Sequence, residues 1–270
     1  MTFLESAAGG ILPTEYAELI TKPVTAQALA FNPALATVVN TGSKELQVPI
    51  LNSDAGAAWV AEGAEITPDD PSIGELTITP RKVAGLTIIS SELAKDSSPA
   101  AQELVGQGLA RSIINQINAA FLGDLAAPAP KGLESLQNVT ELTGSLANLD
   151  VFAESIAAAE DEDAQISGFI AHPSDALLLA KLKEATGSNK TLMEDARTIL
   201  GRPLIVSPKA IPGTVYGVAA PRIITVLRED VEIAVSADSH FTSDRVAIRA
   251  TLRVGFGFPD EASITRITLS

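Results

Sequence analysis

Apolar and polar residues alternate in two short segments near the start of the chain, and a period of two is typical of a strand with one buried face. The segments are Lys44–Leu51, with Leu46, Val48 and Ile50 on one face, and Glu75–Thr79, with Leu76 and Ile78 on one face. They predict a hairpin with a long connecting loop. Because a two-stranded hairpin is only marginally stable in water and long loops are usually functional, we expect it to project and to lean on another surface.

After a further predicted strand, Val83–Ile89, the apolar spacing changes to every fourth residue, which predicts a helix. Its apolar stripe is formed by Val105, Leu109, Ile113, Ile117 and Phe121. Ser98 and Pro99 are a good N-cap and first turn, and Gly123 is a good stop, so the helix should end near residue 122 and measure about 35 Å. We expect Gly106 and Gly108 to mark close packing of this spine helix, because each is costly in a helix.

The second half of the chain predicts a small α/β module followed by long strands. After a loop at 124–148, helices are predicted at Leu149–Glu160 and Ser174–Glu184, and strands at Ile166–Ala171, Leu204–Val206, Thr214–Val218, Arg222–Leu227, Val231–Val235 and Asp244–Phe258. In the last strand Arg245, Arg249 and Arg253 share one face and apolar residues share the other. That basic face is either solvated or matched to acids of another subunit. The sequence Gly255-Phe256-Gly257 is expected to be a bend after the strand.

The predicted hairpin loop has an unusual composition. It contains Trp59, the single tryptophan of the chain, within the acidic stretch AAWVAEGAEITPDD. From Glu45 to Glu75 there are seven acids and neither lysine nor arginine. Nothing around Trp59 resembles a self-sufficient core, so its packing partner has to lie elsewhere.

Composition narrows the class of protein. The 270 residues, of which 46% are hydrophobic and 19% charged, are typical of a globular chain of one elongated domain or two subdomains. A net charge of −14 disfavours tight binding of nucleic acid, so a role near DNA would be containment. The absence of cysteine excludes disulfides and thiolate sites. No apolar run is long enough for a membrane span, and residues 1–12 lack the features of a signal peptide.

Motifs of catalysis and nucleotide binding are absent from the sequence. The run His172–Asp175, HPSD, contains the residue types of a triad, but consecutive residues rarely converge, and a helix cap is the simpler interpretation. His240 has no metal-ligand partner at a useful spacing, and the acidic run Glu160–Asp163 is typical of a solvated helix end. We therefore expect no catalytic residue, no cofactor and no metal.

Three stretches in this order resemble the major capsid proteins of tailed bacteriophages, which share the Hong Kong 97-type fold. They are Ala57–Val105, AAWVAEGAEITPDDPSIGELTITPRKVAGLTIISSELAKDSSPAAQELV, then Phe169–Lys183, FIAHPSDALLLAKLK, and His240–Ile267, HFTSDRVAIRATLRVGFGFPDEASITRI. The resemblance implies an α+β fold with five parts: an N-terminal arm at 1–40, an extended β-hairpin loop at 41–82, a peripheral domain with the spine helix at 83–139, an axial α/β domain at 140–220, and returning strands of the peripheral domain at 221–270.

The same resemblance implies a structural protein and not an enzyme. Similar proteins form pentamers and hexamers, and these build the icosahedral head of a tailed bacteriophage or prophage around double-stranded DNA that is contained without sequence-specific binding. Other copies of the chain are the expected partners, together with a separate scaffold, portal and cement or decoration proteins, and no membrane. The expected location is the virion, after assembly in the cytoplasm of the bacterial host.

The resemblance also suggests where copies meet. Trp59 is expected to pack against another copy, the alternative being its own hairpin. The loop acids Glu62, Glu65, Asp69 and Asp70 would then meet bases of the neighbour, with Arg111, Arg245, Arg249 and Arg253 as candidates.

Two departures from some family members matter. The chain starts directly at the arm, which favours a separate scaffold or none, and the loop has no lysine, so a lysine–asparagine crosslink is not expected.

Two other interpretations remain open at this stage. An encapsulin-type nanocompartment shell is built on the same fold and holds protein cargo, so co-purified cargo would favour it. A monomeric α/β hydrolase-like enzyme using His172, Ser174 and Asp175 belongs to a different class, and loss of activity on His172→Ala would favour it.

Overall fold

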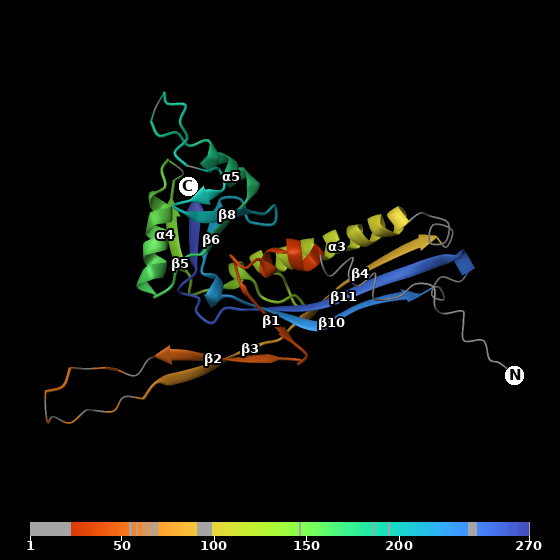
Figure 1. The fold of residues 1–270 in the computed structure, drawn as a ribbon, viewed down its shortest axis with the longest axis horizontal. Coiled ribbons are helices and arrows are strands. Elements are labelled where there is room, and N and C mark those ends of the chain that lie inside the picture. The colour runs from red at the N-terminus through yellow and green to blue at the C-terminus, as the bar shows by residue number, and fades with distance from the viewer. Residues whose placement is uncertain are drawn as a thin grey trace.

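The computed structural model describes residues 23–53, 56, 57, 59–61, 63, 65, 68, 70–90, 99–145, 147–185, 187–193, 195–236 and 242–269. Most of the predicted arm therefore lies outside the described residues, as do Glu62, Asp69, Ser98 and His240. The described part of the chain is elongated, with a long sheet and helix at one end, a mixed module at the other and a hairpin that projects below (Figure 1).

The predicted hairpin is confirmed. Strands β2 (Leu46–Ser53) and β3 (Ser72–Ile78) pair antiparallel, with Leu46 opposite Ile78 and Leu51 opposite Ile73. Exposure alternates along both strands as the sequence pattern predicts. The two strands form a sheet of their own, so their apolar face needs cover from outside the hairpin.

A four-stranded sheet forms the long body of the molecule, in the order β1-β10-β11-β4. Its strands are β1 (Thr37–Thr41), β10 (Ile224–Ser236), β11 (Arg245–Gly257) and β4 (Arg81–Ser90). The two separate strands predicted at 222–235 are one strand, β10, whose register with β11 shifts between Arg228 and Glu232. Such an irregularity explains why the alternation in the sequence breaks there.

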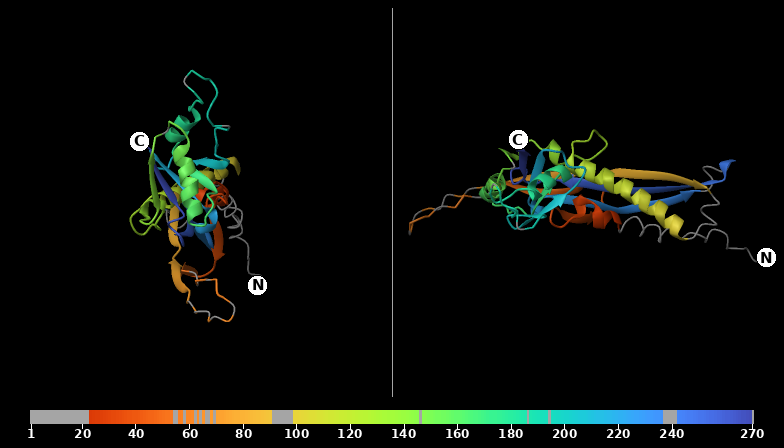
Figure 2. Two further views of the ribbon diagram at one scale, coloured as in Figure 1. Left: turned by 90° about the vertical axis from the view of Figure 1, so that its left-hand side faces the viewer. Right: turned by 90° about the horizontal axis from the view of Figure 1, so that it is seen from above.

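Helix α3 (Pro99–Leu122) runs along one face of this sheet (Figures 1 and 2). The predicted start at Pro99 and stop before Gly123 are confirmed. The close packing expected at Gly106 and Gly108 is wrong within the chain: a Cβ at Gly106 would meet nothing within 4 Å, and one at Gly108 only a terminal atom of Arg111 at 3.9 Å. The tight contact is made instead by Gly85 of β4, which lies against the side chain of Leu109.

The second module is a mixed six-stranded sheet in the order β5-β12-β9-β6-β8-β7, with helices α4 (Asp150–Asp161) and α5 (Pro173–Ala180). Its strands are β5 (Thr140–Gly144), β12 (Thr265–Leu269), β9 (Thr214–Val218), β6 (Gly168–Ala171), β8 (Arg202–Val206) and β7 (Thr198–Ile199). Helix α5 ends four residues before the predicted Glu184, because the chain turns after Lys181 and the backbone of Leu192 bonds back to Leu182.

Strand β12 departs from the expected grouping of residues 221–270 with the peripheral strands. It pairs with β5 and β9 inside the six-stranded sheet, where Thr265 and Ile267 are fully buried. The hydroxyl of Thr265 lies 2.7 Å from that of Ser155 on α4, which secures the strand against the helix. The end of the chain therefore joins the second module to the long sheet.

Two hydrophobic clusters hold these parts together. The first lies between α3 and the four-stranded sheet and includes Phe121, whose ring meets Phe256 edge-on at 5.2 Å. The second lies under α4 and α5, with an edge-on pair of Phe152 and Phe169 at 5.3 Å. Ala28, the short helix η1 (Leu29–Phe31), Leu35 and Ala36 belong to the first cluster, and the Leu29 backbone N–H donates to the side chain of Asn118 on α3.

A buried polar cluster links the six-stranded sheet to the loop that follows α3. Tyr216 of β9 donates a hydrogen bond to Glu134 in the short helix η2 (Leu133–Ser135). Arg266 of β12 stacks over the Tyr216 ring at 5.9 Å and donates to the carbonyls of Leu133, Glu134 and Leu136. Burial first, then the hydrogen bond to Glu134 and its charge, raise the pKa of Tyr216 above its ordinary value.

The raised pKa predicts a loss of stability in alkali. The neutral phenol is favoured in the folded state, so this contribution is present below the unfolded pKa of about 10 and is lost as pH rises above it. The stability advantage of the wild type over Tyr216→Phe should shrink by roughly 1 kcal/mol between pH 10 and pH 11. Urea unfolding of the unassembled chain measures it, and an advantage that is independent of pH would contradict the assignment.

Gly132 allows the loop after α3 to pass directly over the end of that helix. A Cβ built at this position would lie 2.1 Å from the carbonyl oxygen of Ala120 and 2.6 Å from those of Phe121 and Gly123. These atoms are backbone and cannot rotate away, so the approach requires glycine.

We expect Gly132→Ala to lower the free energy of unfolding by about 1–3 kcal/mol, as overpacking does. Gly106→Ala is the matched control, because its Cβ meets nothing within 4 Å and a helical alanine is better by up to about 1 kcal/mol. Chemical denaturation of both variants measures the difference. Equal effects of the two substitutions would show that the contact with the helix end does not constrain the loop.

Candidate interaction surface

The tip of the hairpin is exposed. The exposed fraction of Trp59 is 105%, so no described part of its own chain covers it. Val60, Glu65 and Asp70 are also exposed. The alternative in which Trp59 folds back on its own hairpin is therefore wrong, and a large aromatic surface with nearby carboxylates is left facing water.

The paired strands β2 and β3 form the shaft of the hairpin. One of its faces is exposed to water (the free face), and the other packs at its base on β11 (the seated face). On the free face Leu51 and Ile73 lie opposite each other, with exposed fractions of 54% and 70%. On the seated face Ile78 is almost fully buried. The free face therefore has a second exposed apolar pair besides the tip.

The seat of the hairpin is a pair of glycines at the end of β11. A Cβ at Gly257 would lie 2.2 Å from Cδ1 of Ile78, and one at Gly255 would lie 3.1 Å from its Cγ2. The bend predicted for Gly255-Phe256-Gly257 is wrong, because all three residues lie inside β11. The hairpin base packs on β11 only because these two positions carry no side chain, and this contact sets the direction in which the hairpin projects.

Arg245, Arg249 and Arg253 lie on one face of β11, as the period of two predicts. The structure adds two bases that the sequence analysis missed, because they come from other strands: the register places Lys82 of β4 and Arg228 of β10 opposite Arg253. Residues of β11 on the other face, such as Leu252, pack in the core with α3. The arginines therefore occupy the face of the sheet that α3 does not cover.

Arg111 lies apart from this basic face. It is exposed on α3, whereas its neighbours Leu109, Ala110 and Ile113 are buried against the sheet. The sheet thus separates Arg111 from the other three arginines, and any partner of Arg111 would have to approach from the helix side. Its predicted contact stays a prediction.

The run HPSD forms a helix cap and not a catalytic triad. Nδ1 of His172, at the N-cap of α5, accepts from the backbone N–H of Ser174 at 3.2 Å and lies 2.7 Å from its hydroxyl. Asp175 is buried and accepts from the backbone N–H of Gly213 at 2.8 Å. These residues secure the start of the helix and the loop before β9, which favours the helix-cap interpretation of the sequence.

Other kinds of site are not found in the part of the chain that the structure describes. Within it, no group of three or more acidic, histidine or cysteine side chains is placed to hold a metal ion. No helix among the described residues is both long and apolar enough to cross a membrane.

Known proteins share this architecture. The capsid of an empty GTA particle, computed with C5 symmetry, superposes with a TM-score of 0.75 at 19% sequence identity, over 100% of this chain and 94% of that one. Structures from Mycobacterium phage Adephagia and Microbacterium phage Oxtober96 give TM-scores of 0.74 and 0.71, each at 16% identity, over 97% and 100% of this chain and 99% and 96% of theirs. A search of curated proteins found no match.

These likenesses confirm the predicted α+β fold of the Hong Kong 97 type. The phage capsid family matches residues 9–269, which include the arm, the hairpin, the spine helix and both sheets. Because this match spans nearly the whole chain, the protein belongs to the phage capsid family.

Proposed function

We propose that the chain is the major capsid protein of a tailed bacteriophage or prophage, that it assembles into pentamers and hexamers, and that these form an icosahedral head around double-stranded DNA. The match to the phage capsid family over residues 9–269 supports this function most directly. The role is structural, and no step of catalysis is required of any residue.

The hairpin supports self-association. It carries a tryptophan, Trp59, and the exposed pair Leu51 and Ile73 on a projection that its own chain does not cover. Apolar surface of this kind on a folded chain marks a protein interface. Another copy is a suitable cover, because a repeated lattice places an equivalent surface next to every hairpin.

The net charge of the chain favours a protein that encloses DNA over one that binds it. With a net charge of −14 the chain repels a polyanion on average, so packaged DNA would be held by enclosure and would not stick to the wall. A separate scaffold, a portal and decoration proteins are the further partners proposed. Assembly in the bacterial cytoplasm, ending in the virion, is the location proposed.

Sizing of the purified chain followed by negative-stain electron microscopy tests the proposal. Shells, tubes or rings of subunits are expected. A chain that stays monomeric at every concentration and salt condition tried, with and without co-expressed scaffold, would contradict it. Enzyme cargo inside the shells in place of DNA would instead favour an encapsulin-type compartment.

Trp59→Ala should weaken the shell and leave the subunit intact. Burial of a tryptophan removes roughly 150–250 Å², worth at most about 4–6 kcal/mol at 25 cal/mol per Å². We expect shells of the variant to dissociate at a clearly lower denaturant concentration than the wild type, with Trp59→Phe in between. Unassembled subunits should unfold alike, because Trp59 is already exposed. Shells of equal resistance would show that Trp59 anchors nothing.

Charge contacts between the acidic loop and the basic face should set register more than strength, because each exposed pair is worth about 0–1 kcal/mol. The double variant Arg245→Gln, Arg249→Gln should therefore assemble with more malformed shells and with a yield that depends less on salt. Arg197→Gln is the matched control, since Arg197 is exposed next to β7 of the six-stranded sheet and belongs to neither proposed surface. Light scattering during assembly at low and high salt measures the yield of each variant, and electron microscopy measures the fraction of malformed shells. A wild-type yield indifferent to salt would contradict the charge match.

A further inference from the structure

We propose that Trp59 of one subunit inserts into a preformed apolar pocket at the edge of β4 on a second subunit. This inference rests on the proposed function and makes it specific. It assigns a site to a residue whose partner neither the fold nor the family match identifies.

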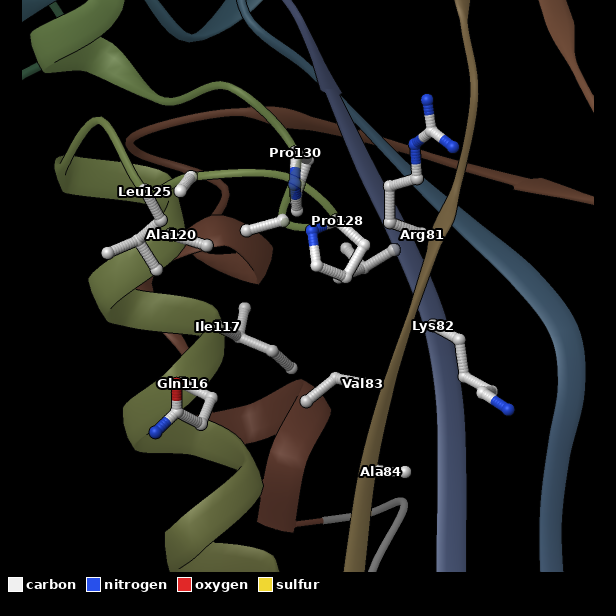
Figure 3. A pocket seen from close by; sticks show the side chains of 13 residues that line it. Arg81, Lys82, Val83, Ala84, Gln116, Ile117, Ala120, Leu125, Pro128 and Pro130 are labelled. Atoms are coloured by element: carbon white, nitrogen blue, oxygen red, sulfur yellow. The ribbon is translucent and has the colours of Figure 1, made fainter.

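The pocket lies between the C-terminal half of α3, the start of β4 and the loop that follows α3 (Figure 3). Its volume is about 470 Å³, within the roughly 300–1,000 Å³ range of pockets that accept small organic groups. The lining is predominantly apolar and includes Val83, Ile117, Ala120, Leu125, Pro128 and Pro130. In Figure 3, Ile117, Val83 and Pro128 border the open space between helix and strand.

The pocket is accessible because β4 is an edge strand, with β11 on one side and, among the described residues, no strand paired on the other. The loop that forms its far wall is held at both ends. Lys131 pairs with Asp124 at 2.5 Å, and Gly132 lies against the carbonyls that end α3. The cavity is therefore shaped before any partner arrives, which lowers the cost of binding.

An indole matches this cavity better than a charged or small side chain does. A tryptophan presents a large, rigid, mostly apolar surface with few rotatable bonds, so little entropy is lost when it is ordered. Trp59 is the single tryptophan of the chain and the most exposed large apolar side chain among the described residues. Val60, beside it, is also exposed and would contact the rim.

The charges around pocket and tip are complementary. Arg81 and Lys82 belong to the pocket's border, and Lys82 lies opposite Arg253, the end of the basic face of β11. The tip that carries Trp59 presents Glu65 and Asp70 and has no base between Glu45 and Glu75. Opposite charges at the rim orient a hydrophobic anchor that carries most of the energy.

The occupant has to come from another copy. In Figures 1 and 2 the hairpin tip extends away from the body that contains α3 and β4, and Trp59 is fully exposed in the single chain. A contact from tip to pocket between two copies is heterologous, with different surfaces on the two partners, and such contacts generate rings and extended lattices.

Fluorescence of the assembled protein tests the proposal directly, because Trp59 is the sole tryptophan. In wild-type shells the emission should shift to shorter wavelength than in the unassembled chain, and quenching by acrylamide should fall several-fold. Leu125→Glu, in the pocket wall, should abolish both changes. Leu178→Glu, at an exposed position of α5 in the second module, is the matched control and should leave them in place.

Crosslinking locates the contact. Since the chain has no cysteine, Val60→Cys with Ala126→Cys introduces a single pair of thiols, one beside Trp59 and one at the pocket. Oxidation or a short bismaleimide should join subunits in assembled shells, and adding Trp59→Ala should lower the yield several-fold. The control pair, Val60→Cys with Ala157→Cys at an exposed position of α4, should not crosslink.

The outcomes separate the inference from the function on which it rests. Shells in which Trp59 stays fully quenchable, or in which the Ala157 pair crosslinks and the Ala126 pair does not, overturn the pocket assignment and leave the capsid function standing. Absence of any assembled species in the sizing experiment overturns the proposed function and the pocket assignment together.

Discussion

A two-stranded hairpin can bury only one of its faces against its own chain, and this constraint governs the whole molecule. The seated face is anchored where Ile78 lies on Gly255 and Gly257, two positions without side chains. The other face, with Leu51 and Ile73, and the tip, with Trp59, stay in water. A chain that places this much apolar surface on a projection is complete only in contact with another molecule.

The long sheet divides the remaining surface into two kinds. Helix α3 covers one face with Leu109, Ile113 and Ile117, and this contact forms the main core. The opposite face carries the base of the hairpin at Gly255 and Gly257, together with the three arginines of β11 and Lys82 of β4. Because both faces belong to the same four strands, the packing that stabilises the subunit also sets the spacing of the charges that a neighbour would meet.

The elements that the sequence predicted best are those whose signal is local. The start of α3 at Pro99 and its end before Gly123 depend on capping rules, and the hairpin depends on strict alternation. The errors arose where a distant contact decides. The bend expected at Gly255–Gly257 is strand because Ile78 fills the space, and β12 joins the second sheet because β5 and β9, far away in sequence, pair with it.

The candidate site shows the same limit. Alternation in β11 was enough to place Arg245, Arg249 and Arg253 on one face, but Lys82 and Arg228 join them only through strand register, which depends on the folded sheet. Arg111 was grouped with them by charge alone, and the thickness of the sheet separates it. The net charge disfavours contact with polyanions on average, whereas the proposed contact between copies uses a local arrangement, acids on the projecting hairpin and a row of bases on one face of the long sheet. Under this proposal a chain of net negative charge would attract a second copy at one defined contact while it repels DNA on average.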